Sequence, residues 1–243
     1  ARPGGAIGTG ESALAGARRE AQEEADIRSA DVLPVVSSVR DHGTWSYTTI
    51  VARTIGATRP VLLPLDGESA DLRWVPLDAV ASLPLHPSFA AAWPALRSLA
   101  TVEPTLLIDA ANVLGARPDG WWRDRAGATS RLLARVSAAV VQGVPGAWFG
   151  LEAAAAWPRT VVVLEGRARE TLDPDGEAHL RILRASGSGD DVIATTAHEL
   201  AAATRGPLVV VTADRGLRDR LPATTLTLGP GALREVVDGP RLP

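Results

Sequence analysis

Cysteine, methionine and lysine are absent from this chain of 243 residues. Without cysteine, the chain can form neither disulfides nor thiolate zinc sites. All 25 basic residues are therefore arginine, and they stand against 28 acidic residues, which gives a formal net charge of −3. Residues 1–103 carry 9 arginines and 12 acids, and residues 104–243 carry 16 of each. Neither half has a positive field that would recruit nucleic acid, so any such contact must be local.

Long apolar runs are missing as well. No stretch reaches the roughly 18 residues that a membrane-spanning helix needs, and no signal peptide is visible. The chain is 46% hydrophobic and 22% charged, which is ordinary for a globular protein. We therefore expect a cytoplasmic protein with no membrane partner. The exclusive use of arginine, with abundant alanine, glycine and proline, indicates a GC-rich bacterial genome.

The most informative stretch lies between residues 1 and 27. A glycine-rich turn precedes a predicted helix in which Glu20, Glu23 and Glu24 have the spacing i, i+3, i+4. This spacing places three carboxylates on one helical face, where like charges repel by roughly 0.2–0.5 kcal/mol per pair. Mg²⁺ would reverse that cost, because it is a hard ion that takes oxygen ligands. These residues alone are consistent with a metal site or with a solvated acidic helix.

The spacing around this helix resembles the Nudix box of nucleoside-diphosphate hydrolases. The match covers 23 positions, and its residues are Gly5, Glu11, Arg19, Glu20, Ala21, Glu23, Glu24 and Ile27. There is one departure, because Asp26 stands where the family usually has glycine at the end of the helix. Aspartate tolerates that position better than a branched residue, since short polar side chains visit the left-handed region.

The resemblance implies a role for each residue of the motif. The implied ligands of Mg²⁺ or Mn²⁺ are Glu20, Glu23 and Glu24. The Gly5 carbonyl is a further candidate ligand, Arg19 orients the glutamates, and Glu11 is chiefly structural. The implied reaction is attack of water on a diphosphate bridge, with release of a nucleoside monophosphate. In that reaction the metal lowers the pKa of the water and neutralises developing charge.

The resemblance also implies a fold for residues 1–99. Nudix domains are α/β/α sandwiches in which strands precede the box, whereas this chain begins inside the motif, so we expect a domain that is incomplete at its N-terminus. Strands are predicted at 32–39, 45–54, 61–65 and 72–75, and a helix at 88–99. We expect His42 and His86 to face solvent or cap backbone groups. Glu68 is a candidate extra metal ligand, although a solvated loop acid is the preferred interpretation.

Residues 105–243 follow a different pattern, after a predicted linker at 100–104. Short continuous apolar runs are typical of strands covered on both faces, and they occur at 105–108, 160–164 and 208–212. A last strand is predicted at 224–228. Helical patterns lie between the strands, at 124–141 and 191–204. This alternation predicts a parallel α/β domain.

Acidic side chains follow these predicted strands. Functional groups gather at the carboxyl ends of parallel strands, and Asp109, Glu165 and Asp214 occupy such ends. A turn of glycine and serine then leads into Asp190 and Asp191. Any one of these acids could simply cap a helix. Several that converge would be costly without cations, and such clusters normally bind Mg²⁺ or Mn²⁺.

The segments 108–128, 187–191 and 212–217 resemble the NYN subgroup of PIN-like nucleases. The implied metal ligands are Asp109, Asp190 or Asp191, and Asp214. Asn112 would position a water molecule or a phosphate oxygen. The implied reaction is metal-assisted hydrolysis of an RNA phosphodiester.

Arginine and tryptophan residues surround these acids in the sequence. Arg117, Arg123 and Arg215 are the predicted substrate-binding residues, because the planar guanidinium suits phosphate. Trp121 and Trp122 either stack on the bases of single-stranded RNA or pack inside the protein.

The leading interpretation is a two-domain hydrolase. Its Nudix half would cleave nucleotide substrates at a diphosphate bridge, and its PIN-like half would cleave or bind single-stranded RNA. The alternative is an RNA-binding or regulatory protein in which one or both modules lack catalysis. The oligomeric state is not predicted.

Overall fold

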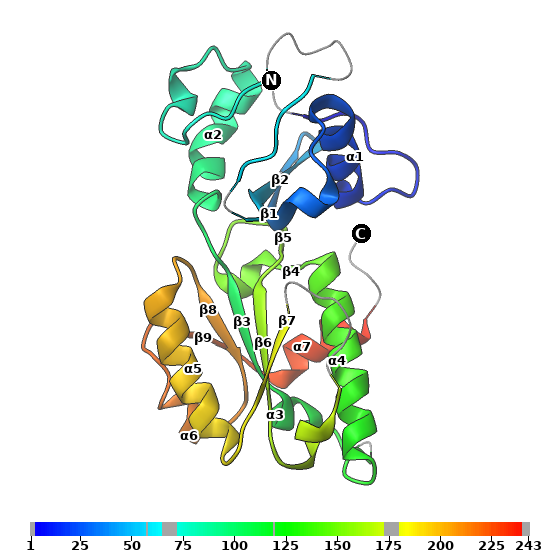
Figure 1. The fold of residues 1–243 in the computed structure, drawn as a ribbon, viewed down its shortest axis with the longest axis vertical. Helices are drawn as coiled ribbons and strands as arrows, with labels where there is room; N and C mark the ends of the chain where they lie inside the picture. The colour runs from blue at the N-terminus through cyan, green and yellow to red at the C-terminus, as the bar shows by residue number, and fades with distance from the viewer. Residues whose placement is uncertain (1–2, 57, 65–71, 119, 173–179, 240–243) are drawn as a thin grey trace. The chain divides into compact units, whose positions relative to one another are not determined.

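The computed structural model describes residues 3–56, 58–64, 72–118, 120–172 and 180–239 (Figure 1). The chain divides into two compact units, Ala1–Thr101 and Val102–Leu242. Each unit has its own secondary structure and buried core, and each is described by itself below.

The N-terminal unit combines two helices with a β-hairpin. Its main elements are α1 (Ala13–Ala25), β1 (Val32–Asp41), β2 (Ser46–Thr54) and α2 (Pro87–Leu99), with short 3₁₀ helices at Ser29–Asp31 and Val80–Ser82. The two strands pair in antiparallel fashion, with an irregularity between Pro34 and Val36. Gly43 lies at φ 82° in the hairpin turn and donates its N–H to Asp41 Oδ1 at 2.7 Å. The hairpin and the helix predicted at 88–99 are confirmed.

Two of the predicted strands in this unit are wrong. Residues 61–64 and 72–75 form no strand in the described part of the chain. Pro60 and Pro64 flank the first run, and a proline cannot donate to a strand ladder. The Leu63 N–H instead donates to the Ala25 carbonyl at the end of α1, at 3.3 Å. The Trp74 indole N–H donates to the Pro60 carbonyl at 3.0 Å. Leu65 and Glu68 lie outside the described residues.

The C-terminal unit is built on a five-stranded parallel sheet. Its strands are β3 (Thr105–Asp109), β6 (Arg159–Leu164), β7 (Leu180–Arg184), β8 (Leu208–Val211) and β9 (Leu226–Leu228). The spatial order is β7-β6-β3-β8-β9, and every neighbouring pair is parallel. The predicted parallel sheet is confirmed. The sequence did not predict edge strand β7, because arginines interrupt its apolar run.

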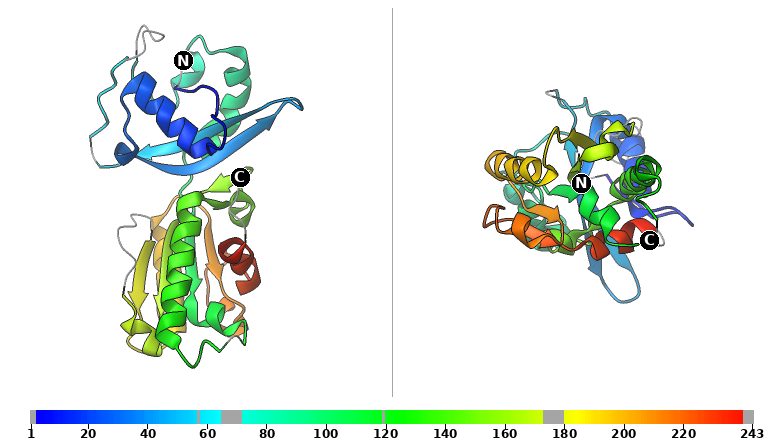
Figure 2. Two further views of the ribbon diagram at one scale, coloured as in Figure 1. Left: turned by 90° about the vertical axis from the view of Figure 1, so that its right-hand side faces the viewer. Right: turned by 90° about the horizontal axis from the view of Figure 1, so that it is seen from below.

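Helices cover both faces of this sheet (Figures 1 and 2). One face packs on α5 (Gly189–Ala203), where Leu107, Val163 and Val210 meet Ile193 in one buried cluster. The opposite face is covered by α4 (Arg125–Gln142) and α7 (Pro230–Asp238). The short elements of the unit are α3 (Ala110–Gly115), α6 (Arg215–Arg218), β4 (Val144–Pro145), β5 (Ala155–Ala156) and 3₁₀ helices at Gly146–Phe149 and Gly166–Glu170.

The winding of the sheet fixes where a ligand can enter. The chain starts in the central strand β3, adds β6 and β7 on one side, and then returns to add β8 and β9 on the other side. The direction of winding therefore reverses between β3 and β8. Parallel α/β sheets bind ligands in the crevice outside the carboxyl ends of the strands at such a switch point.

Candidate functional site

Arg19 organises the acidic face of α1 in the N-terminal unit. Its Nε lies 3.1 Å from Glu11 Oε1, and its Nη1 lies 2.7 Å from Glu20 Oε1 and 3.0 Å from Glu23 Oε2. Its Nη2 donates to the Ala6 carbonyl at 3.0 Å. These partners use the whole planar fork of the guanidinium. Arg19 therefore lies where a residue that orients the glutamates must lie.

The glycine-rich turn closes over the same carboxylates. A Cβ atom on Gly5 would come within 2.7 Å of the carboxylate carbon of Glu20, so a side chain at this position would displace that carboxylate. The Gly4 N–H donates to Glu24 Oε2 at 3.3 Å. The Glu20 side chain is 13% exposed, whereas that of Glu23 is 58% exposed. Arg19 thus joins one shielded and one accessible carboxylate, Glu20 and Glu23, and the Gly4 N–H holds the third, Glu24.

Glu11 ties the turn to the helix. It accepts the Gly8 N–H at 2.8 Å and pairs with Arg19. The hydrogen bond from Arg19, with a smaller contribution from the Gly8 N–H, holds the pKa of Glu11 below its usual value. The same ion pairs raise the pKa of Arg19. The contacts of Glu11 lie within the loop and the helix, in keeping with a structural role.

The end of α1 contains the departure from the family pattern. Asp26 has φ 54° and ψ 30°, and it is the one non-glycine residue with positive φ in the described ranges. Its N–H donates to the Gln22 carbonyl, and the Ile27 N–H donates to the Ala21 carbonyl, both at 3.1 Å. This pattern ends helices at a left-handed residue. The prediction that Asp26 replaces the glycine in that conformation is confirmed.

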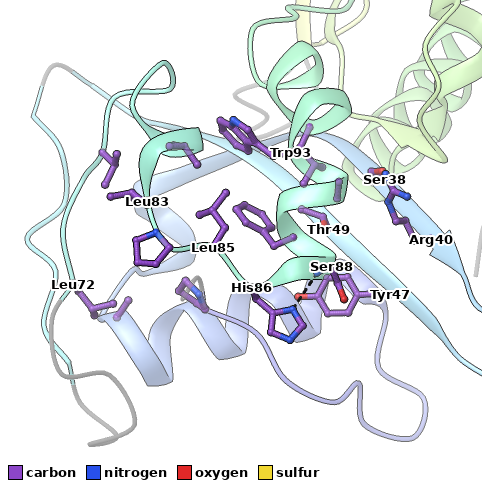
Figure 3. Close-up of a pocket in the computed structure, with 18 of the residues that line it drawn as sticks. Ser38, Arg40, Tyr47, Thr49, Leu72, Leu83, Leu85, His86, Ser88 and Trp93 are labelled. Carbon is purple, nitrogen blue, oxygen red and sulfur yellow. Dashed lines mark hydrogen bonds between the residues drawn. The ribbon is translucent and has the colours of Figure 1, made fainter.

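A cavity of about 840 Å³ lies beside the end of α1 (Figure 3). Ala25 and Ile27 contribute to its wall. The chain has ten aromatic residues of the Phe, Tyr and Trp type, and five of them line this cavity: Trp45, Tyr47, Trp74, Phe89 and Trp93. Sequence reasoning missed the cavity, because its walls come from segments spread over most of the unit. The concentration of scarce aromatic residues was the available signal.

Two histidines also line this cavity. The His42 ring stacks on Trp45 with centroids 4.3 Å apart and an interplanar angle of 17°. His86 Nδ1 accepts the Ser88 N–H at 3.3 Å and caps the N-terminus of α2. The capping role predicted for a turn histidine is therefore confirmed for His86.

A second polar group lies at the switch point of the C-terminal unit. Asp109 ends β3 and is only 6% exposed. Its Oδ1 accepts the Asn112 N–H at 3.0 Å, and its Oδ2 accepts the Thr212 hydroxyl at 3.0 Å. Asn112 Oδ1 in turn accepts the Ala213 N–H at 2.8 Å. These bonds join the ends of β3 and β8 across the crevice.

Two carboxylates at this edge have raised pKa values, Asp109 and Asp190. Burial raises the pKa of Asp109, the bonds from Asn112 and Thr212 oppose the shift, and the charges of Asp190 and Glu165 add to it. Burial also raises the pKa of Asp190, and the charges of Asp214 and Glu165 raise it further. The predicted acids therefore share one electrostatic environment.

The two adjacent aspartates of α5 have different surroundings. Asp191 Oδ1 pairs with Arg220 at 2.6 Å on the surface. Asp190 is the residue whose pKa responds to the other acids of the edge. The structure thus favours Asp190 over Asp191 as the member of the acidic group.

Two further residues position these acids. Glu165 Oε2 accepts the Gly189 N–H at 2.9 Å and so fixes the turn before Asp190. The Thr212 hydroxyl oxygen accepts the Asp214 N–H at 3.2 Å, and the same hydroxyl donates to Asp109. Sequence reasoning missed Thr212, because a threonine at the end of an apolar strand has no distinctive pattern.

Residues 1–97 match the family model of the NUDIX domain. Residues 1–97 are a Nudix domain. Over 92 residues the chain is 40% identical to a "Nucleoside triphosphate pyrophosphatase/Nudix hydrolase fusion protein" of Bifidobacterium longum. This match covers 38% of this chain and 19% of that protein. Over 114 residues it is 40% identical to a "Putative 8-oxo-dGTP diphosphatase 3" of Mycobacterium tuberculosis, covering 44% of this chain and 51% of that protein.

A solved structure is also similar to the chain. The Nudix hydrolase RenU from M. Smegmatis is 38% identical, with a TM-score of 0.38, and the match covers 41% of this chain and 63% of that one. The chain thus spans about half or less of the curated relatives described above. In the described residues, no helix is long and apolar enough to cross a membrane.

The carboxylates of the Nudix domain and of the switch point supply the donors for a cation. As the side chains stand, no three His, Asp or Glu residues of the described ranges are gathered closely enough to hold a metal ion. The donor chemistry nevertheless fits Mg²⁺ or Mn²⁺, because both groups offer oxygen atoms alone. In the Nudix domain, the absence of a side chain at Gly5 makes room for the carboxylate of Glu20.

The arginines predicted to bind substrate lie in different surroundings. Arg117 pairs with Asp238 at 3.5 Å, whereas Arg123 and Arg215 are exposed. Arg218 donates to the Thr212 carbonyl at 2.6 Å, which supports the end of β8. These contacts leave Arg123 and Arg215 exposed for a ligand, and they place Arg117 in a separate cluster.

The tryptophan pair contains one exposed and one partly buried ring. Trp122 is 54% exposed. Trp121 meets it edge-on at 6.2 Å between centroids and carries the Arg125 guanidinium 4.8 Å from its ring centroid. Stacking on a base therefore suits Trp122, whereas Trp121 has a role inside the unit.

Proposed function

We propose that the Nudix domain hydrolyses a nucleotide substrate at a diphosphate bridge. The observation that carries this proposal is the Arg19 cluster, in which one guanidinium holds Glu20 and Glu23 beside the Gly5 turn. Glu20, Glu23 and Glu24 would hold Mg²⁺ or Mn²⁺. When bound, that ion supplies an activated water and neutralises charge on the phosphate groups.

The residues of this chain have distinct tasks in the proposed reaction. Arg19 holds Glu20 and Glu23 at fixed positions, because its fork binds both carboxylates and the loop carbonyl of Ala6. Glu23 is the accessible carboxylate and can accept a proton at the reacting face. Glu11 keeps the loop and the helix together and does not contact the substrate.

The aromatic cavity next to α1 is the proposed site of the nucleobase. Trp45, Tyr47 and Trp74 are partly exposed within it, and flat aromatic rings suit a flat heterocycle. Two relatives are named for a nucleoside triphosphate and for 8-oxo-dGTP. The substrate panel should therefore include nucleoside triphosphates, 8-oxo-dGTP, and nucleoside diphosphates linked to a second group.

Replacement of Glu23 by glutamine tests the proposed nucleotide hydrolysis. With Mg²⁺ or Mn²⁺ present, we expect kcat/KM to fall at least about a hundredfold, since loss of even an outer-shell partner of a metal costs about 10- to 100-fold. Asp78→Asn is the matched control, because Asp78 is an exposed acid in a turn of the same unit. A Glu23→Gln protein as active as this control would show that the assignment is wrong.

We propose as a second function that the C-terminal unit cleaves single-stranded RNA with Mg²⁺ or Mn²⁺. Asp109, Asp190 and Asp214 would supply the oxygen donors. Burial raises the pKa of both Asp109 and Asp190, and the charge of Asp190 adds to the first shift and that of Asp214 to the second, which supports this role. Asn112 uses its carbonyl oxygen on the Ala213 N–H, so its amide NH₂ can donate to a phosphate oxygen. The alternative is a unit that binds RNA without cutting it.

Asp109→Asn distinguishes these two possibilities. We expect cleavage of single-stranded RNA in Mn²⁺ to fall at least about a hundredfold, for the reason given for Glu23. Asp219→Asn is the control, because Asp219 is an exposed acid beyond α6. If the unaltered protein retards RNA in a gel and never cuts it, the binding alternative holds.

A further inference from the structure

A pocket of about 270 Å³ lies among three helices of the C-terminal unit. Its wall includes Leu114 of α3, Trp121 from the loop that follows, and Asp238 at the end of α7. Three arginines line it: Arg131, Arg135 and Arg234. The pocket is therefore basic, in a unit with no overall basic charge.

One carboxylate pairs with two of these arginines and with Arg117. Asp238 lies 2.5 Å from Arg135, 3.5 Å from Arg117 and 3.8 Å from Arg234. A single negative charge cannot neutralise three guanidinium groups. The pocket thus has a surplus of positive charge that a multiply charged anion would offset.

Two of the arginines are available to a ligand. Arg131 and Arg135 are four residues apart on α4, so they lie on one face of the helix. Their side chains are 62% and 55% exposed. Like charges at this spacing destabilise a helix by roughly 0.2–0.5 kcal/mol. Among the residues that the structure describes, the exposed Asp124 is the ion-pair partner of Arg131, at 3.6 Å.

The third arginine has a structural task. The Nε and Nη2 atoms of Arg234 donate to the Val113 carbonyl at 3.1 and 3.0 Å, and the residue is buried. Arg234 therefore joins α7 to α3 and forms a fixed wall of the pocket.

A chain of neighbouring residues that begins with Trp121 leads from the pocket toward the acidic edge. The acidic edge is the group formed by Asp109, Glu165, Asp190 and Asp214. Trp121 lines the pocket, and the Arg125 guanidinium lies over its ring. A Cβ atom on Gly166 would lie 3.5 Å from Arg125 Nη1, and Gly166 directly follows Glu165. A nucleic-acid strand at the acidic edge could therefore reach the arginines across Trp121.

We propose that this pocket binds a phosphate group of a single-stranded nucleic acid, with Arg131 and Arg135 as the donors. The proposal rests on the proposed RNA function of the same unit and adds a phosphate anchor beside its acidic edge. The phosphate is either a terminal monoester or a diester of the strand, and arginine forks suit both. When the phosphate is absent, Asp238 pairs with Arg135, and Asp124 pairs with Arg131.

Binding of short fluorescent RNA, measured by anisotropy in EDTA, tests the anchor separately from cleavage. We expect the double variant Arg131→Gln/Arg135→Gln to bind at least about tenfold more weakly, because it loses the charge-assisted hydrogen bonds of both arginines to the phosphate. The slope of log affinity against log salt should fall by about 0.7 if one phosphate contact is lost. Arg159→Gln is the control, since Arg159 is exposed at the opposite, amino end of β6.

RNA with a 5′-phosphate and RNA with a 5′-hydroxyl distinguish the two sources of the phosphate. Tighter binding of the phosphorylated strand, lost in the double variant, supports a terminal phosphate. Equal binding of both strands, weakened in the double variant, supports a phosphate of the backbone. If the double variant binds both strands as well as Arg159→Gln does, the anchor is wrong, while the proposed RNA function stands. If the unaltered protein binds neither strand, both proposals fail.

Asp238→Asn provides an independent test. Removal of the competing carboxylate should strengthen RNA binding, whereas loss of a purely structural ion pair would not. Unchanged or weaker binding would mean that the arginines serve to hold α7, and would overturn the proposal.

Discussion

Individual side chains of the Nudix domain are packed so closely that the addition of one atom would move a carboxylate. Arg19 contacts Glu11, Glu20 and Glu23 together, and Gly5 leaves the space that Glu20 fills. That these residues lie together could be predicted from sequence, because all of them belong to one short motif, whereas their roles stay predictions. Substitutions at this scale should therefore affect activity before they affect folding.

Gly5→Ala should lower nucleotide hydrolysis without unfolding the Nudix domain. The added Cβ would come within 2.7 Å of the Glu20 carboxylate carbon and displace it. Misplacement of a catalytic group by about 1 Å can cost about a hundredfold, so we expect kcat/KM to fall by about 10- to 100-fold. Gly8→Ala is the control, since its Cβ would approach no atom closer than 3.4 Å. Equal activity of both variants would contradict the prediction.

Asp109 should make the C-terminal unit less stable as pH rises. Burial raises its pKa in the folded state above the usual 3.8. Below pH 3.8 the carboxyl is protonated in both the folded and the unfolded state. As pH rises from 3.8 to the raised pKa, the carboxyl ionises more readily in the unfolded state, so the free energy of unfolding falls. Asp109→Asn should therefore have the higher Tm above this window, when calorimetry is done in EDTA. A Tm difference that does not change with pH would refute this account.

The sequence could not predict the partners of several site residues, for a physical reason. The pairs Asp109–Thr212 and Arg135–Asp238 are each 103 residues apart in the chain. Contacts of that kind depend on how the sheet and its helices pack, and no local pattern encodes them. The aromatic cavity was missed for the same reason.

At the scale of elements, patterns of burial decided which predictions succeeded. Strands β3, β6 and β8 are covered on both faces, so their sequences are continuous apolar runs, and their positions were predicted. Edge strand β7 has exposed arginines and no such run. The expected strands near 61–65 and 72–75 were wrong where they are described. Prolines lie in or directly after these runs, and the Leu63 N–H and the Trp74 indole N–H donate to the carbonyls of Ala25 and Pro60 instead of to a strand.

Asp26→Gly should stabilise the end of α1. A residue other than glycine costs roughly 1–2 kcal/mol in the left-handed conformation, and glycine adopts it freely. We expect slower hydrogen exchange of the amides in the last turn of α1, equivalent to a gain of up to about 1 kcal/mol. Asp26→Ala should have faster exchange than the unaltered protein. Faster exchange in Asp26→Gly would mean that the Asp26 side chain stabilises the cap.

At the scale of the whole molecule, the chain holds two units with separate cores and separate acidic groups. The Nudix carboxylates lie on α1, and the other carboxylates lie at the edge of a parallel sheet. Each proposed activity therefore depends on residues of one unit alone.

The two proposed activities should be separable by single substitutions. We expect Glu23→Gln to lose nucleotide hydrolysis and keep RNA cleavage within about twofold, since Glu23 is an exposed residue of the other unit and surface substitutions usually cost little. Asp109→Asn should show the reverse. Both activities should be measured on the same preparation of the full chain. Loss of both activities in either variant would show that the units depend on each other.

The reversal of winding between β3 and β8 has a consequence for how the C-terminal unit can change over evolution. The point of reversal is set by the path of the backbone, whereas the acids beside it are individual side chains. A descendant that exchanged Asp109 or Asp214 for neutral residues would lose the proposed metal-dependent chemistry and retain the reversal. Such a protein would keep the edge at which parallel sheets bind ligands, so an enzyme of this architecture can become a receptor without a new fold.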